Sequence, residues 1–153
     1  MSFKSVMNSQ KTSKQFTVLH VKSKPLVPYN GWDAGSVAAI VEVGAKAVAT
    51  SSASVASAQG YEDGEYLPLD FALEIVRRIV ETIDVPVTVD FEGGYSEDDG
   101  ELASNISKLI ELGVVGINFE DIGWSKAMGC TASVDRRIAA IRRAAEQKGI
   151  PFF

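Results

Sequence analysis

The residues whose types and spacing most clearly suggest a chemical function lie in segment 85–95, which has the sequence VPVTVDFEGGY. An apolar, β-branched run typical of a buried strand ends in two carboxylates, Asp90 and Glu92, followed by Gly93 and Gly94. Side chains two positions apart in an extended segment point the same way, so we expect both carboxylates to face one point. Converging carboxylates repel unless a proton or cation lies between them, so the pattern predicts a divalent metal ion; a solvated acidic turn is the alternative.

Polar side chains also follow two other predicted strands. Ser51 follows the second strand, Asp63 lies in the loop beyond that strand, and Glu120 follows the fourth strand. In parallel α/β folds the carboxyl ends of the strands meet at one rim, where ligands bind. The serine-rich stretch SSASVASAQG is either low-complexity sequence or a place where backbone N–H groups approach an anion. The residues that we expect at this rim are Ser51, Asp63, Asp90, Glu92 and Glu120.

Four strands followed by helices would position these residues. The strands are predicted over Pro25–Tyr29, over Ala45–Thr50, at the start of segment 85–95 and over Val114–Phe119, and residues 150–153 resemble the start of a fifth strand. Their alternation with helices predicts parallel strands joined by right-handed crossovers. A doubly wound sheet and a (β/α)8 barrel both remain open, although the absence of G-x-G-x-x-G after the first strand disfavours a dinucleotide-binding fold.

The segments between the strands carry apolar residues at the period of an α-helix. The clearest stripe runs from Ala72 to Ile83, and Arg77, Arg78 and Glu81 lie off it, as on a solvated face. Polar residues predict the starts of three helices and glycines predict the ends. The predicted caps are Asp33, Ser96 and Ser133, and the predicted ends are Gly44, Gly113 and Gly149.

Composition limits the class of protein. The chain has 153 residues, of which 46% are hydrophobic, enough for one globular domain. Its formal net charge of -5 argues against non-specific nucleic-acid binding, and no apolar run reaches the ~18 residues of a membrane span. One cysteine, Cys130, fits a reducing compartment, and the polar residues 1–15 predict a disordered lead-in to a cytoplasmic protein. We interpret the single histidine, His20, as structural.

The strings NGWDAGSV, ATSSASVASAQGYEDGE, VDFEGGY and GVVGINFED, in this order, resemble the phosphoenolpyruvate mutase/isocitrate lyase family. The resemblance runs from Phe16 to the last residue and implies a (β/α)8 TIM barrel. Residues 16–153 would then be the amino-terminal half of the barrel, with βα units 1–4 and the start of strand 5. The resemblance also implies a homo-oligomer and Mg²⁺-assisted enolate chemistry, with Mn²⁺ as an alternative ion, in which a small 2-oxo or 2-hydroxy acid gains or loses a C–C or P–C bond.

Individual roles follow from the same resemblance. Glutamate at position 92 stands where the family usually has aspartate, and the acid at position 120 commonly holds the metal through water. The backbone N–H groups of the two serines would bind the 2-oxo acid. The implied metal ligands are Asp90, Glu92 and Glu120, the substrate-binding residues are Ser51, Ser52 and Asp90, and the catalytic residues are Asp63 and Lys126.

The chain departs from the family pattern after the fourth strand. Carbon–carbon lyases of the family carry a K-[KR]-C-G-H loop whose cysteine is the general acid, whereas this chain has Met128 at the cysteine position, between Lys126 and Gly129. A thioether cannot deliver a proton, so a true isocitrate or methylisocitrate lyase is disfavoured. Cys130 could substitute only if the loop shifted, and we expect an inert thiol there.

The second departure is length, because a barrel of this kind takes ~250 residues and the family's later arginine is absent. We expect a fragment of a longer protein; the alternative is two copies that complete each other. Three hypotheses for function remain open. The first is a carbon–carbon lyase or phosphonomutase-like enzyme, the second a catalytically silent 2-oxo-acid-binding homologue or inactive fragment, and the third a half-barrel module that self-associates.

Overall fold

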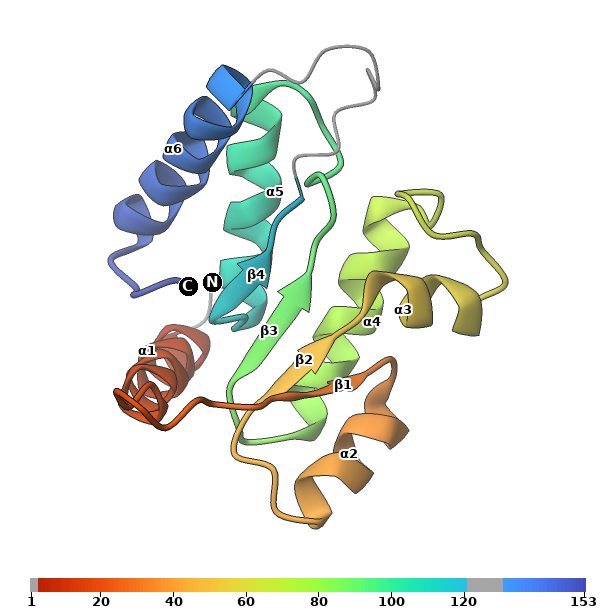
Figure 1. The fold of residues 1–153 in the computed structure, drawn as a ribbon, viewed down its shortest axis with the longest axis vertical. Helices are drawn as coiled ribbons and strands as arrows, with labels where there is room; N and C mark the ends of the chain where they lie inside the picture. The colour runs from red at the N-terminus through yellow and green to blue at the C-terminus, as the bar shows by residue number, and fades with distance from the viewer. Residues whose placement is uncertain (1–2, 121–130) are drawn as a thin grey trace.

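The computed structural model describes residues 3–120 and 131–153, and shows a parallel sheet with helices packed beside it (Figure 1). The strands are β1 (Tyr29–Gly31), β2 (Val48–Thr50), β3 (Val87–Asp90) and β4 (Gly116–Asn118). The helices are α1 (Phe3–Leu19), α2 (Ala34–Glu42), α3 (Ser52–Ala58), α4 (Leu69–Thr82), α5 (Asp99–Leu112) and α6 (Thr131–Lys148). None of the helices in these ranges is long and apolar enough to cross a bilayer.

The sheet has the order β1-β2-β3-β4, and every neighbouring pair is parallel. The last residue extends the sheet beyond β4, since Phe153 N donates to Val115 O at 3.1 Å and Ile117 N donates to Phe153 O at 2.9 Å. Gly116 permits this approach, because a Cβ there would lie 2.7 Å from the Phe153 carbonyl oxygen. The predicted start of a fifth strand is therefore present as a pair of ladder hydrogen bonds.

Four helices cover one face of the sheet. Val48, Val87 and Val89 point to this face, and they share one buried cluster with apolar side chains of α2, α4, α5 and α6. Consecutive helices also contact one another in the order of the chain. A doubly wound sheet would have helices on both faces and a reversal in strand order, so the observed arrangement favours the barrel among the two predicted alternatives.

Helix α1 covers the end of the sheet at which the strands begin. Its Phe16 is buried against Ala47 and Val115, which precede β2 and β4, and the hydroxyl of its fully buried Ser13 donates to the carbonyl of Pro151. The prediction of a disordered lead-in over residues 1–15 was therefore wrong for the described part. The polar composition hid two positions, one turn apart, that face the sheet.

His20 directly follows α1. It lies at the end of the sheet where the strands begin, opposite to the acidic strand ends. Its Nδ1 is 2.8 Å from the carbonyl oxygen of Phe16, and its ring stacks on that of Phe153 at 5.3 Å between centroids. These contacts agree with the structural role that we predicted for it.

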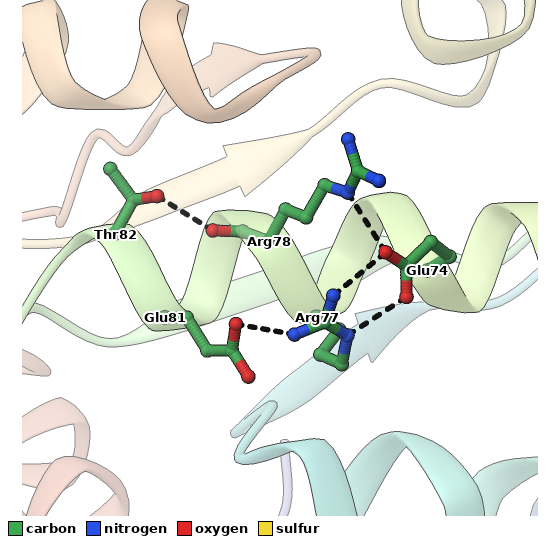
Figure 2. A network of polar contacts seen from close by, with 5 residues as sticks. All are labelled: Glu74, Arg77, Arg78, Glu81 and Thr82. Atoms are coloured by element: carbon green, nitrogen blue, oxygen red, sulfur yellow. Dashed lines mark hydrogen bonds and ion pairs between the residues drawn. The ribbon is translucent and has the colours of Figure 1, made fainter.

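The outward face of α4 carries a network of charged side chains (Figure 2). Glu74 accepts hydrogen bonds from Arg77 and Arg78, and Arg77 also pairs with Glu81. These hydrogen bonds lower the pKa of Glu74 to about 2. The side chains are largely open to solvent, so the network is the solvated face that the sequence predicted, and it contributes little to stability.

The strands differ from prediction mainly at their starts. The strand predicted over Pro25–Tyr29 begins at Tyr29 and runs to Gly31, because Pro25 and Pro28 have no N–H to donate to a neighbouring strand. Strands β2 and β4 also begin later than predicted, although both lie within the predicted ranges.

The predicted helix caps had mixed outcomes. Asp33 caps α2 as predicted, and Gly113 ends α5 with a φ of 104°. The prediction of Ser96 as a cap was wrong, because the Asp98 carboxylate accepts from the first free N–H groups of α5 and the Ser96 hydroxyl donates to Glu101 instead. Ser133 was also wrong as a cap, since α6 begins at Thr131.

The anchoring of α1 gives a test of stability. We expect Phe16→Ala to lower the free energy of unfolding by about 3 kcal/mol, the usual cost of truncating a buried phenylalanine. The matched control is Val18→Ala on the same helix, where the side chain is 75% exposed and the change should stay within about 0.5 kcal/mol. Urea unfolding of both variants measures the difference, and equal effects would show that α1 does not pack as described.

Candidate functional site

Asp90 is the centre of the acidic rim, at the carboxyl end of β3. Its Oδ2 accepts hydrogen bonds from the backbone N–H and the hydroxyl of Ser52, both at 3.0 Å. Its backbone N–H donates to Thr50 Oγ1 at 3.0 Å. Alternation along β3 places Val87 and Val89 in the core and turns Asp90 to the face that the four helices leave uncovered. Ser52, at the start of α3, thus fixes the carboxylate, and Thr50 of β2 fixes the backbone of Asp90.

The second oxygen of this carboxylate has no partner. Asp90 Oδ1 is buried and accepts no hydrogen bond from the described residues. A buried carboxylate oxygen without a donor carries a large desolvation cost, so such atoms commonly mark the position of an ion or a water molecule. This oxygen is the strongest structural indication of a ligand at the rim.

The serine-rich stretch forms α3 instead of a loop. Ser51 caps this helix through its hydroxyl, which accepts from Ser54 N at 3.4 Å. The backbone N–H of Ser52, which we predicted to bind a 2-oxo acid, is hydrogen-bonded to Asp90 here. Ser52 therefore holds the carboxylate in place in this structure, and its contact with an acid substrate stays a prediction.

The chain turns sharply directly after Asp90. Glu92 has a φ of 48° and Tyr95 a φ of 60°, and Gly94 between them has a φ of 82°. The left-handed conformation costs a residue with a Cβ roughly 1–2 kcal/mol. Our assumption of an extended segment through Glu92 was therefore wrong, because the strand ends at Asp90 and the backbone at Glu92 is left-handed.

Residues from four separate segments of the chain hold this turn through hydrogen bonds. Glu120 N donates to Glu92 O at 2.7 Å, and Tyr95 N donates to Glu65 Oε1 at 2.7 Å. The side-chain amide of Asn105 donates to Gly94 O at 3.1 Å. Arg137 of α6 donates to two carbonyl oxygens, those of Gly93 and, at 2.7 Å, Ser96. The disfavoured backbone is thus stabilised by partners that lie far away in the sequence.

The turn places the Glu92 carboxyl in an unfavourable electrostatic position. The residue is only 8% exposed. Burial, followed by repulsion from Asp63, Glu65 and Asp90, raises its pKa to about 7, although a hydrogen bond from the Glu65 backbone opposes the shift. Near neutral pH this side chain is therefore divided between its neutral and charged forms.

Two further groups respond to the same charges. Burial and the charges of Asp90 and Asp63 raise the pKa of Glu120. Burial raises the pKa of the Tyr95 phenol, and the nearby carboxylates, Glu92 first among them, add to the effect. Asp63 thus lies near the other acids, although it comes from the loop between α3 and α4. Of the predicted rim residues, Asp63 and Asp90 thus act on both Glu92 and Glu120, and the gathering of all five residues at one site stays a prediction.

The carboxylates do not form a compact metal-binding cluster in this arrangement. Within the described residues, no three Asp, Glu, His or Cys side chains are placed so as to hold one ion directly. The predicted joint ligation by Asp90, Glu92 and Glu120 therefore stays a prediction. Of the predicted catalytic residues, Lys126 lies outside the described residues, as do Met128 and Cys130.

A small cavity of about 30 Å³ lies beside the rim. Thr50, Ser52, Asp90, Glu92 and Tyr95 line its polar part. Apolar residues of α3, α4, α5 and β3, together with Leu67 and Phe91, line the rest. This volume admits a water molecule and is far smaller than the several hundred Å³ of an ordinary ligand pocket. The cavity is therefore too small to hold an organic ligand.

Sequence reasoning missed several residues that position the acidic turn. The side chains of Thr50, Glu65, Asn105 and Arg137 act through hydrogen bonds with backbone groups of Asp90 and of the turn that follows it. Asn105 and Arg137 gave a usable signal, since each is a polar residue on a helix face that is otherwise buried. Thr50 and Glu65 gave none, because threonine is common in strands and glutamate in loops.

Comparisons with known proteins agree with this architecture. The family model described as phosphoenolpyruvate phosphomutase matches residues 16–153. An uncharacterised protein of Mycobacterium tuberculosis is 30% identical over 128 residues, which cover 84% of this chain and 48% of that protein. The 2-methylisocitrate lyase of Escherichia coli is 26% identical over an alignment 153 residues long, which covers 96% of this chain and 52% of the lyase.

A solved structure from Burkholderia cenocepacia, assigned to the phosphonomutases, is 38% identical and superposes with a TM-score of 0.89. The alignment covers 95% of this chain and 58% of that one. The chain thus spans about half the length of the relatives that it matches. Since the family match extends over all but the first residues, the chain belongs to the phosphoenolpyruvate phosphomutase family.

Proposed function

We propose that this chain is the amino-terminal half of a (β/α)8 barrel, and that the complete protein is a Mg²⁺-dependent lyase or mutase. Its substrate would be a small 2-oxo or 2-hydroxy acid, in which it makes or breaks a C–C or P–C bond. Proteins of the superfamily include lyases and mutases that act on small acids, such as the 2-methylisocitrate lyase of Escherichia coli. Homo-oligomer formation is part of the same proposal.

The sheet supports the barrel. Its strands are parallel and in chain order, and α2, α4, α5 and α6 lie on one face. Parallel sheets are almost always covered on both faces, and closure into a barrel covers the second face with side chains of the sheet itself. The ladder hydrogen bonds of Phe153 show that the sheet already extends beyond β4.

The observation that carries the functional proposal is the unpartnered Oδ1 of Asp90. It lies at the rim where parallel α/β proteins bind ligands, and the field of Asp63, Glu92 and Glu120 surrounds it. A cation beside it would remove both the desolvation cost of this oxygen and the repulsion among the acids.

The donor set fits Mg²⁺. Every candidate ligand is an oxygen atom, and Mg²⁺ keeps several water molecules and uses only one or two carboxylates. Asp90 would hold the ion directly, and Glu92 and Glu120 would hold its water molecules. A phosphonopyruvate hydrolase that shares the fold, with a TM-score of 0.76 at 16% identity, was solved with oxalate and Mg²⁺.

The residues of this chain would contribute positioning and charge. Ser52 and Thr50 hold Asp90 in one orientation, so its free oxygen is fixed before a ligand arrives. When bound, Mg²⁺ would supply the positive charge that stabilises an enolate oxygen. Asp63 and Lys126 are the candidates for moving the proton, because Met128 has no proton to give.

Calorimetric titration of the full-length protein with oxalate in the presence of Mg²⁺ tests the proposal. We expect Asp90→Asn to weaken binding about 100-fold, since the amide supplies one neutral oxygen where a charged ligand is needed. The matched control is Asp84→Asn, which makes the same change of charge just before β3, at the opposite end of the strand. This control should bind as the wild type does.

Equal binding by wild type and Asp90→Asn would refute the site. Binding without turnover of phosphonopyruvate, oxaloacetate or methylisocitrate would instead favour the catalytically silent homologue. Turnover that is lost in Asp90→Asn and kept in Asp84→Asn would support the enzyme.

The raised pKa of Glu92 gives a prediction for stability without metal. A carboxyl with a pKa of about 7 in the folded state and 4.5 in the unfolded state binds more protons when folded. The protein should therefore lose stability as the pH rises from about 4.5 to 7, by about 1–3 kcal/mol, since one pKa unit corresponds to about 1.4 kcal/mol.

Glu92→Gln should remove this loss, so the variant should be more stable than the wild type at pH 8 and similar to it at pH 4.5. Thermal unfolding across this range, without divalent ions, measures both curves. Parallel curves for the two proteins would contradict the assignment of the titration to Glu92.

A further inference from the structure

Arg137 is a buried cation that the proposed chemistry does not use. It lies in the first half of α6 and is only 5% exposed. Within the described residues its hydrogen bonds go to the carbonyl oxygens of Gly93 and Ser96 and to no carboxylate. Its guanidinium also lies over the ring of Phe119, 4.9 Å from the centroid. A buried charge without a counterion is costly, so this placement needs an explanation beyond packing.

The targets of Arg137 flank the strained part of the chain. Gly93 and Ser96 enclose Gly94 and Tyr95, both of which have positive φ, and Gly93 follows Glu92 directly. One guanidinium that binds both carbonyl oxygens fixes the two ends of this short turn at once. Figure 1 shows the start of α6 beside the segment that joins β3 to α5.

The neighbouring arginine, Arg136, has a different partner. Arg136 is largely exposed and pairs with Asp99 at 3.3 Å, at the start of α5 and beyond the turn. Asn105 assists from α5 through its bond to Gly94 O, but it is neutral. Arg137 is therefore the one cationic side chain that the described residues place on the carbonyl oxygens of the turn.

We infer that Arg137 is a positioning residue for the acidic rim: it fixes the Glu92–Tyr95 turn and, through it, the placement of the Glu92 side chain beside Asp90. The planar fork of the guanidinium suits this role, because it donates in two directions from a rigid frame. An ammonium group is a flexible point charge, and its side chain does not hold two carbonyl oxygens in a fixed geometry. This inference rests on the proposed function for its effect on ligand binding, but not for its effect on the turn.

The test compares Arg137→Met and Arg137→Lys with Ile141→Ala in the full-length protein. Ile141 is buried on the same helix, and its apolar side chain can donate no hydrogen bond to the turn, so its truncation destabilises α6 and leaves the hydrogen bonds of Arg137 in place. The first readout is hydrogen exchange of the Gly94 and Tyr95 amides, which donate to Phe91 O and Glu65 Oε1. The second readout is the affinity for oxalate in the presence of Mg²⁺.

In Arg137→Met we expect exchange of these two amides to be at least about 10-fold faster than in Ile141→Ala when the two are compared at equal global stability. The Val48 amide, which bonds to Pro86 O at 2.9 Å, should exchange alike in both variants. The affinity for oxalate should fall about 10-fold in Arg137→Met, less in Arg137→Lys, and not in Ile141→Ala.

Unchanged exchange at Gly94 and Tyr95 would overturn the inference, whatever the affinities. Faster exchange with unchanged affinity would overturn the link between the turn and the site. If the wild type itself binds no oxalate, the proposed function fails and the positioning role in binding fails with it. The exchange data alone would then decide whether Arg137 fixes the turn.

Discussion

Repulsion among carboxylates at the end of one parallel sheet is the constraint on which the rest of the structure depends. The chain places Asp90, Glu92 and Glu120 at neighbouring strand ends and adds Asp63 from a loop, and burial strengthens the repulsion. Folding must therefore supply enough fixed contacts to hold groups that would otherwise separate. It does so with hydroxyl and N–H donors around Asp90 and with a buried arginine behind the turn. Such an arrangement costs stability in the free protein, and we propose that a cation at Asp90 would offset this cost.

Much of the fold could be predicted because its signals are local. Apolar periodicity identified α4 and α5, and glycines such as Gly113 marked where helices end. Polar residues after successive strands were expected to share a rim, and Asp63 and Asp90 both raise the pKa of Glu92 and that of Glu120, which agrees with such proximity. The parallel direction of the strands followed from their alternation with helices, whereas their order was left open between a barrel and a doubly wound sheet.

The remainder could not be predicted because it depends on contacts between distant segments. The burial of Phe16 against Val115 cannot be read from a polar terminus. The left-handed φ of Glu92 arises from partners on α5, on α6 and in the loop before α4, and glutamate gives no local sign of it. Single-sequence patterns report propensity, whereas a strained turn exists only because tertiary contacts outweigh propensity.

The central claim is that Asp90 Oδ1 receives a divalent cation. The most direct measurement is an anomalous difference map from a crystal of the full-length protein soaked with Mn²⁺ and oxalate, since Mn²⁺ shares the oxygen preference of Mg²⁺. We predict one strong peak about 2.1 Å from Asp90 Oδ1, with Glu92 and Glu120 within reach of the water molecules of the ion. Absence of ion density at Asp90, or an ion bound elsewhere while Oδ1 keeps no partner, would contradict it.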